Sequence, residues 1–306
     1  MSILLTLVLF FLLFLIGSAF AVLVIGPLIL LQPQRRTEAW YRRFTTIVEP
    51  RDADLPQENI TVTTHDGLHL KGWLVSKGPV ARGTILFLHG VGDCKIAGIP
   101  IARLLFTRGY NVFLYDSREH GESDGDYCTY GYYEKYDVVT VIDYLVKRTD
   151  LEIGKIGVFG TSMGAAVGIQ AAVLDNRIAA VIAEASFTDL KTISVDYQRR
   201  IIKLPWHFLR NVYLSRSQKL ASFKARHVSP LEDVKRLRAP ILFIHGTNDT
   251  FIRYTYSEIL FERANEPKEI LLIPGGDHTN LWEIGGHVYQ QRITSFFDKH
   301  LQDGER

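Results

Sequence analysis

The sequence is poor in cysteine, with only Cys94 and Cys128 among its 306 residues. Their spacing matches no metal-binding motif, and a single disulfide would constrain so large a chain only weakly. We therefore expect two free thiols, which favours a reducing compartment. Internal repeats, low-complexity tracts and nucleic-acid-binding motifs are also lacking, so no solenoid and no nucleic-acid partner is expected. With 47% hydrophobic residues and a net charge of +2, the chain suits one large domain.

Charged residues are absent from Ile3 to Leu31. About 20 apolar residues suffice to cross a bilayer, and a buried core helix is rarely so long. The alternative is a cleaved signal peptide ending at Ala21, but cleavage there would leave an apolar N-terminus, and no basic side chain precedes the apolar run. We expect an uncleaved transmembrane anchor over residues 1–31 that contributes no strand or site residue to the rest of the protein.

Basic residues follow this span, whereas none precedes it: Arg35, Arg36, Arg42 and Arg43. The positive-inside rule then places the domain after the span in the cytoplasm, tethered by a single pass. The glycosylation sequon at 248–250 agrees weakly, because it lies in the candidate site described below and a glycan there would block it. A bacterial exported enzyme would escape that second argument.

Apolar strands alternate with helices from residue 60 to residue 303, after a linker at 32–59. We expect strands at 60–64, 68–75, 84–88, 112–115, 155–160, 179–183, 241–244 and 269–273, and helices at 101–108, 133–147, 165–174, 254–263 and 288–300. This alternation predicts an α/β fold with a mostly parallel central sheet covered by helices on both faces. Ligand sites in such sheets lie at the carboxyl ends of the strands.

One stretch joins a strand, a glycine-flanked serine and a helix: Gly160-Thr-Ser162-Met-Gly164. In such a turn the positions two before and two after the serine must be nearly free of side chain, and the serine hydroxyl projects above the sheet. The small residues that follow suit a helix packed closely on that sheet. This context predicts that Ser162 is a catalytic nucleophile.

The same G-x-S-x-G pattern occurs a second time, at Gly121-Glu-Ser123-Asp-Gly125. Several polar residues separate it from the strand that ends at Tyr115, and turn-rich aromatic sequence follows it in place of a helix. We therefore expect Ser123 to have a structural role in a loop.

A serine nucleophile needs a base, and the base needs an acid that fixes its tautomer. Asp249 follows the strand at 241–244, and His278 follows the next strand, at 269–273. Because adjacent strand ends can bring two side chains together, we expect Asp249 and His278 to be the acid and the base. Two alternatives stay open: Asp249 could instead cap the following helix, and Glu184, at another strand end, could be the acid.

Other downstream residues fit these roles less well. Asp277 is next to His278 in sequence, and neighbours cannot easily bond side chain to side chain in the required geometry. The remaining histidines lie in an insertion, before a glycine at a strand end, or in the terminal helix: His207, His227, His245, His287 and His300.

The oxyanion formed during acyl transfer needs fixed donors, which backbone N–H groups supply. We expect the Met163 N–H, directly after the nucleophile, and the Val91 N–H, in the glycine-rich loop after the strand at 84–88. His89 is expected to brace that loop. Cys94 lies nearby, but no Cys-His arrangement supports it as a nucleophile.

With these motifs in place, the chain resembles the α/β-hydrolase superfamily, specifically membrane-anchored serine hydrolases related to lipases and esterases. The resemblance covers roughly residues 60–301 and rests on His89-Gly-Val-Gly92, Asp116 to Ser123, Gly160 to Gly164, Gly246 to Asp249 and Gly276-Asp-His278. The chain order serine, aspartate, histidine is also that of the superfamily. The resemblance implies hydrolysis through an acyl-enzyme, with no metal or cofactor. Esterases, thioesterases, amidases and peptidases all share this machinery.

An insertion at about 190–228 is strongly basic. It carries nine basic residues against one acid, Asp196: Lys191, Arg199, Arg200, Lys203, Arg210, Arg216, Lys219, Lys224 and Arg226. Apolar and aromatic residues, among them Trp206 and Phe208, lie between the charges. In the family such an insertion forms a cap over the serine. This cap is either an ordinary solvated surface or one that binds anionic membrane lipids.

These features predict a membrane-tethered serine hydrolase that cleaves carboxylic esters of lipid-like substrates. The alternative enzyme is an acyl-protein or acyl-thioester hydrolase. A serine peptidase fits less well, because no additional gating domain is present. A non-catalytic scaffold is disfavoured by the intact set of serine, aspartate and histidine.

Overall fold

The computed structural model describes the backbone of residues 3–202 and 207–302, and their side chains except those of 199–202 and 207–208. Within these residues, one eight-stranded sheet has the order β1-β2-β4-β3-β5-β6-β7-β8. The strands are β1 (Glu58–Thr63), β2 (His69–Val75), β3 (Thr84–Leu88), β4 (Asn111–Tyr115), β5 (Ile156–Thr161), β6 (Ile178–Glu184), β7 (Ile241–Gly246) and β8 (Lys268–Ile273). Strand β2 is antiparallel to β1 and β4, and the other neighbours are parallel. The predicted α/β fold is confirmed.

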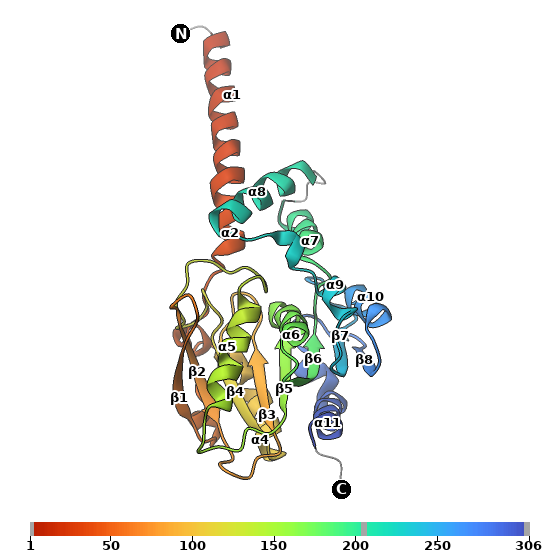
Figure 1. Ribbon diagram of the computed structural model, residues 1–306. Helices are drawn as coiled ribbons and strands as arrows, with labels where there is room; N and C mark the ends of the chain where they lie inside the picture. The colour runs from red at the N-terminus through yellow and green to blue at the C-terminus, as the bar shows by residue number, and fades with distance from the viewer. Residues whose placement is uncertain (1–2, 203–206, 303–306) are drawn as a thin grey trace.

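Helices cover both faces of the sheet (Figure 1). Side chains of α5 (Glu134–Val146), α6 (Met163–Leu174), α9 (Pro230–Val234) and α10 (Thr255–Arg263) pack in the core on one face, and those of α4 (Ile99–Thr107) and α11 (Leu281–Leu301) in the core on the other. Strands β3 and β4 are buried at every residue. This double burial explains their continuous apolar sequences.

Helix α11 begins earlier than the sequence predicts. It is broken at Gly286, where φ is 47° and ψ is −132°, so its first turns point in another direction. Glycine tolerates this positive φ, whereas other residues would be strained there. Because of this break, the helical periodicity in the sequence becomes regular only from Val288.

The N-terminal apolar segment is one rod made of α1 (Ile3–Phe20), a π-helical turn (Ala21–Ile25) and α2 (Gly26–Leu31). Proline disrupts the preceding turn of a helix, and the π-helical turn ends two residues before Pro27, where it absorbs that disruption. Helix α1 stands away from the domain and has no buried residue (Figure 1). Among the described residues, Ile3–Leu31 is the one helix long and apolar enough to cross a membrane, with a mean hydropathy of 3.0.

The last turn of this rod belongs to the domain. Leu30 and Leu31 are 7% and 0% exposed and lie in the core. The backbone carbonyl of Leu30 accepts a 2.9 Å hydrogen bond from the Tyr130 hydroxyl, and that of Leu31 accepts a 2.7 Å bond from the Cys128 N–H. The segment up to Leu31 was expected to supply no strand and no site residue, and what the structure adds is that its last turn packs in the core, since an apolar helix face can meet protein as well as lipid.

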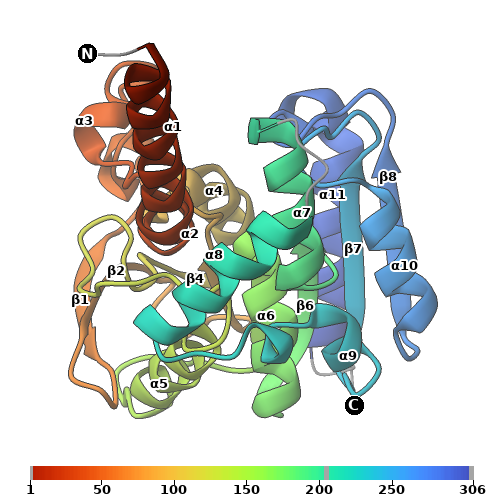
Figure 2. The same cartoon turned by 90° about the horizontal axis from the view of Figure 1, so that it is seen from above.

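The expected cap contains α7 (Leu190–Ile202) and α8 (His207–Leu220). Helix α8 lies beside α2, as Figures 1 and 2 both show. The two helices approach so closely that a Cβ on Gly26 would lie 3.2 Å from the Cβ of Tyr213. The cap therefore lies at the end of the domain from which the apolar helix leaves.

Not all of the basic residues expected on the cap surface are there. Arg210 is only 8% exposed, and its guanidinium binds the Asn211 side chain, because this face of α8 is turned toward the protein. Lys203 and Trp206 lie outside the described residues, as do the side chains of Arg199, Arg200 and Phe208. Exposed cap residues with a positive charge are Lys191, Arg216, Lys219, Lys224 and Arg226.

Candidate active site

Ser162 lies in a sharp turn between β5 and α6, with φ 53° and ψ −114°. A Cβ on Gly160 would lie 2.3 Å from the Gly164 carbonyl oxygen, and a Cβ on Gly164 would lie 2.0 Å from the Leu88 carbonyl oxygen. No side chain fits at either position, which confirms the reason inferred for the two glycines. A non-glycine residue at positive φ is strained, and such strain often occurs where a side chain must be held for a function.

The structure brings Ser162, His278 and Asp249 together. The Nε2 atom of His278 lies 3.2 Å from the Ser162 Oγ, and its Nδ1 lies 2.7 Å from Asp249 Oδ2. The Asp249 side chain is completely buried, whereas that of His278 is 17% exposed. The imidazole is thus held between a buried carboxylate and a serine hydroxyl, at the carboxyl ends of β5, β7 and β8.

Hydrogen bonds keep the Asp249 carboxylate ionised. Its Oδ1 accepts bonds from the N–H groups of Phe251 and Ile252, at 2.8 and 2.9 Å, and its Oδ2 accepts bonds from His278 and His245. Burial alone would raise the pKa of Asp249, but these bonds hold that pKa well below its usual range. An ionised carboxylate only accepts, so the His278 proton sits on Nδ1 and leaves Nε2 free to accept from Ser162.

His245, which the sequence made a less suitable base than His278, is a second histidine bound to Asp249. Its Nε2 lies 2.9 Å from the Ile252 carbonyl oxygen and 3.1 Å from Asp249 Oδ2, so this nitrogen carries the proton. Its Nδ1 then accepts from the Ser257 hydroxyl at 2.7 Å. In the sequence, only the spacing of four residues between His245 and Asp249, across the end of one strand, could have indicated that these two side chains meet.

Glu184, the alternative acid, forms no hydrogen bond with His278. Its carboxylate accepts a 2.5 Å hydrogen bond from the Tyr289 hydroxyl, while its backbone carbonyl accepts from the Ser162 N–H at 2.8 Å. Burial raises the pKa of Glu184 to about 7, and the bond from Tyr289 offsets only part of that effect. A second carboxyl group therefore lies close to the site without a direct bond to the imidazole.

The two expected oxyanion donors flank Ser162. Met163 is the first residue of α6, and the first N–H groups of a helix have no partner within that helix. Val91 follows Gly90, where a Cβ would lie 3.3 Å from the Ser162 Cβ. The imidazole of His89 bridges the loop that carries Val91, since it lies 2.8 Å from the Gly90 carbonyl oxygen and accepts from the Ser117 N–H at 2.9 Å.

The second G-x-S-x-G serine has a structural role, as expected. Ser123 is buried; its hydroxyl donates to the Asp116 carbonyl and accepts from the Lys71 N–H, at 2.6 and 2.8 Å. The two cysteines are free and buried, also as expected. Burial raises the pKa of Cys94 to about 12, so this thiol is a poor nucleophile.

A cavity of ≈ 970 Å³ opens beside Ser162 and His278. Most of its lining residues are apolar or aromatic, among them Trp40, Ile47, Phe87, Ile96, Phe159 and Trp282. Val91 and Glu184 also line it. Across the described residues, no group of three or more His, Cys, Asp or Glu side chains has the arrangement of a metal site. The site thus offers a serine, a base and an apolar chamber of small-molecule size.

The family described as serine aminopeptidase, S33, has a model that matches residues 79–229. The protein YfhR of Salmonella typhimurium is 30% identical over 305 residues, which cover 94% of this chain and 96% of YfhR. YqkD of Bacillus subtilis is 30% identical over 237 residues, or 76% of each chain. The Arabidopsis thaliana α/β-hydrolase domain-containing protein WAV2 is 28% identical over 268 residues, covering 84% of this chain and 83% of WAV2.

A solved structure, that of the esterase Pf2001 of Pyrococcus furiosus, is similar over 83% of this chain and 94% of the esterase, with a TM-score of 0.69 and 25% identity. The match with YfhR reaches into the N-terminal helix, because an alignment over 94% of this chain cannot leave out all 29 residues of Ile3–Leu31.

Proposed function

The chain belongs to the α/β-hydrolase superfamily and is a hydrolase, and from that premise we propose that it is a membrane-anchored serine hydrolase acting on carboxylic esters of lipid-like substrates. The observation that carries the proposal is the pair of hydrogen bonds joining Ser162, His278 and Asp249 beside an apolar cavity. The esterase activity named for the similar solved structure is a further support.

In the proposed mechanism, the Ser162 Oγ bonds to the substrate carbonyl carbon while His278 Nε2 takes the hydroxyl proton. The negative charge on the carbonyl oxygen is stabilised by the N–H groups of Val91 and Met163. The ester bond then breaks, and the leaving alcohol receives the proton from His278. Water, activated by the same imidazole, releases the acid from the acyl-enzyme. Asp249 stabilises the charged imidazole throughout.

The lipid-like substrate class is supported by the cavity and by the N-terminal helix. The apolar lining favours an acyl chain or another apolar group near Ser162. The apolar rod, which we propose spans the membrane, leaves the domain at the end where the cap lies, so a substrate dissolved in a bilayer would need to travel only a short distance. The basic residues after the rod favour a cytoplasmic domain.

The second candidate is an aminopeptidase, because the matching family is described by that activity. Acyl-thioester and acyl-protein hydrolysis would use the same groups. Turnover of p-nitrophenyl esters of increasing chain length, of matched thioesters and of amino-acid p-nitroanilides ranks these activities directly. Fastest turnover of long-chain esters is expected, whereas turnover of the anilides alone would replace the proposal with a peptidase.

Labelling with a fluorophosphonate probe tests the nucleophile. We expect the wild-type protein to be labelled, Ser162→Ala to be unlabelled, and the matched variant Ser123→Ala to be labelled if it folds. Ester hydrolysis by Ser162→Ala should be several orders of magnitude slower than hydrolysis by the wild-type protein. Labelling that survives in Ser162→Ala would sink the assignment.

A further inference from the structure

The last residues of the membrane helix and the segment after it form hydrogen bonds and ion pairs with the loops around the site. We call residues 30–41 the juxtamembrane strap. Its first residues bind the loop at 126–130, through the bonds to Leu30 and Leu31 described above and a 3.2 Å bond from the Gln32 side chain to the Asp126 carbonyl oxygen. Cys128, in the same loop, has its Sγ 3.3 Å from the Sδ of Met163. The strap therefore contacts one side of the site through that loop.

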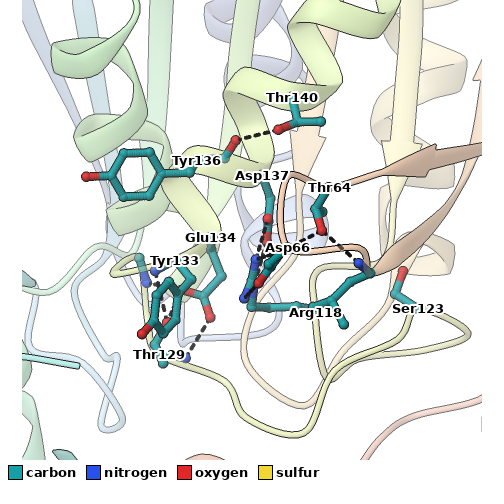
Figure 3. A network of polar contacts seen from close by, with 12 residues as sticks. Thr64, Asp66, Arg118, Ser123, Thr129, Tyr133, Glu134, Tyr136, Asp137 and Thr140 are labelled. Atoms are coloured by element: carbon teal, nitrogen blue, oxygen red, sulfur yellow. Dashed lines mark hydrogen bonds and ion pairs between the residues drawn. The ribbon is translucent and has the colours of Figure 1, made fainter. Parts of the chain in front are cut away.

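Arg35 continues the attachment. Its guanidinium binds the Glu119 carboxylate at 2.6 Å and the carbonyl oxygens of Ser123 and Gly125 at 3.1 and 2.9 Å. Polar side chains from other elements also hold this loop, as Figure 3 shows. Arg118 binds Asp137 of α5 and Asp66 of the β1–β2 turn, at 2.6 and 3.0 Å. The strap thus lies on a braced surface.

Helix α5 holds these loops through two buried acids. Asp137 binds Arg118, and burial raises the pKa of Asp137 to about 6 although Arg118 lowers it in part. Glu134, one helical turn before it, accepts from the N–H and the hydroxyl of Thr129, at 2.6 and 2.7 Å. Figure 3 shows how Glu134 attaches the loop at 126–130 to α5 through Thr129. Thr129 lies between Cys128 and Tyr130, the two residues that bind the strap.

The far end of the strap holds the loop that carries Val91. The Arg36 N–H donates to the Gly92 carbonyl at 3.1 Å, and its guanidinium binds Asp93 Oδ2 at 2.9 Å. The Tyr41 hydroxyl donates to the other oxygen of Asp93. A Cβ on Gly92 would lie 3.2 Å from the Gln34 carbonyl oxygen, so the two chains are in close contact.

These contacts act on a turn that includes the proposed oxyanion donor. The Asp93 N–H donates to the Gly90 carbonyl at 3.2 Å and closes a turn whose second central residue, Gly92, has φ 73°. Such a turn fixes the direction of the Val91 peptide N–H between them. Asp93 joins the strap to this turn, because its carboxylate accepts hydrogen bonds from both Arg36 and Tyr41.

We propose that the juxtamembrane strap positions the oxyanion donor of Val91, with Arg36 and Tyr41 as positioning residues that act through Asp93. The inference rests on the proposed function, since it assumes acyl transfer at Ser162. Under this proposal, full activity depends on how the last turn of the membrane helix packs against the domain, because the strap begins at that turn. Neither residue needs to touch the reacting atoms.

The test compares an ester with its thionoester, in which sulfur replaces the carbonyl oxygen. Sulfur is a weaker hydrogen-bond acceptor, so a well-placed oxyanion donor accelerates the ester more than the thionoester. Loss of one donor lowers kcat by about 10²–10³. For Arg36→Gln combined with Tyr41→Phe we expect a loss of about tenfold or more in ester kcat and a clear fall in the ester-to-thionoester ratio of kcat. The ratio is the deciding measurement, because both residues also line the cavity and their loss can change KM.

Arg42→Gln is the matched control, because Arg42 directly follows the strap but pairs with exposed Glu38 and not with Asp93. Arg42→Gln should retain the wild-type ester-to-thionoester ratio. Arg36→Lys should lower the ratio less than Arg36→Gln does, because lysine keeps a positive charge beside Asp93. If the double variant hydrolyses both substrates more slowly by the same factor, so that the ester-to-thionoester ratio is unchanged, the inference is overturned while the proposed function stays intact. Activity that survives in Ser162→Ala would remove the proposed function and this inference together.

Discussion

The backbone carbonyl of Leu31, at the end of the N-terminal apolar helix, accepts a 2.7 Å hydrogen bond from the N–H of Cys128. The boundary between anchor and domain therefore does not coincide with the end of the apolar sequence. A truncation that removes residues 2–20 takes away α1, which has no buried residue, whereas one that removes residues 2–31 also takes away Leu30 and Leu31 from the core.

We predict that the shorter truncation keeps its activity and stability, and that the longer one loses about 3–6 kcal/mol of unfolding free energy, from two buried leucines at about 1.5–3 kcal/mol each. Urea denaturation of both proteins in the same detergent measures this difference. Leu31→Ala in the full chain should reproduce part of the loss. Equal stability of the two truncated proteins would mean that the last turn of the helix contributes nothing.

The second prediction concerns the acid. Asp249→Asn should lower kcat by about 10⁴, because an asparagine cannot stabilise the charged imidazole or hold it in the right tautomer. Glu184→Gln should cost much less, since Glu184 binds Tyr289 and not His278. Steady-state kinetics on a short ester rank the two variants, with circular dichroism to check that both fold. The opposite ranking would transfer the role of the acid to Glu184.

The sequence predicted well those features that depend on local pattern. Strands buried on both faces appear as apolar runs, and the turn at Ser162 can be recognised because two close backbone contacts require Gly160 and Gly164. The meeting of Asp249 with His278 follows from adjacent parallel strand ends. Each of these depends on regular geometry that is repeated from one α/β protein to another.

What could not be predicted depends on contacts between distant and irregular segments. Arg36 and Asp93 are 57 positions apart, and Glu184 and Tyr289 are 105 apart, with no periodic pattern to pair them. An apolar helix turn has the same sequence character whether it faces lipid or protein, so the burial of Leu31 was not visible. Residues 32–59 were expected as a linker, but the structure packs Val48, Ala53 and Leu55 in the core.

The third prediction is a pH dependence of stability that originates at Glu184. Its pKa is raised by burial from 4.5 to about 7, with the Tyr289 hydroxyl, His278 and Asp249 as its polar surroundings. Between these values the folded protein keeps a proton that the unfolded chain releases, so stability falls as the pH rises through this range. At about 1.4 kcal/mol per pKa unit, the fall is on the order of 3 kcal/mol.

Urea denaturation at several pH values between about 4.5 and 7.5 measures the slope. Glu184→Gln should make the slope shallower, because the amide does not titrate, while the contribution of Asp137, whose pKa burial also raises, remains. Glu262→Gln, a change at an exposed residue on α10, should leave the slope at its wild-type value. A slope that is the same in Glu184→Gln and in the wild type would show that the carboxyl of Glu184 is not its source.

The last prediction is that the basic cap draws the site onto an anionic membrane surface. A basic residue near an anionic leaflet contributes about 1 kcal/mol, so three exposed cap residues acting together would matter. The variant Arg216→Gln, Lys219→Gln, Lys224→Gln removes three such charges without changing the site. We expect slower hydrolysis of esters presented in anionic vesicles, unchanged hydrolysis of a short soluble ester, and a vesicle effect that weakens with added salt.

The matched control neutralises three exposed arginines at the opposite edge of the sheet, Arg108, Arg238 and Arg263, which lie just before β4, β7 and β8. Parallel strands begin at one edge and end at the other, so these charges lie away from the cap and from the membrane helix (Figure 1). Their loss changes the net charge by the same amount and should leave vesicle activity at its wild-type level. If both triple variants lose vesicle activity equally, the effect comes from net charge and the cap is an ordinary solvated surface. If only the cap variant loses it, and neutral vesicles abolish the difference, the cap binds anionic headgroups while the substrate reaches Ser162.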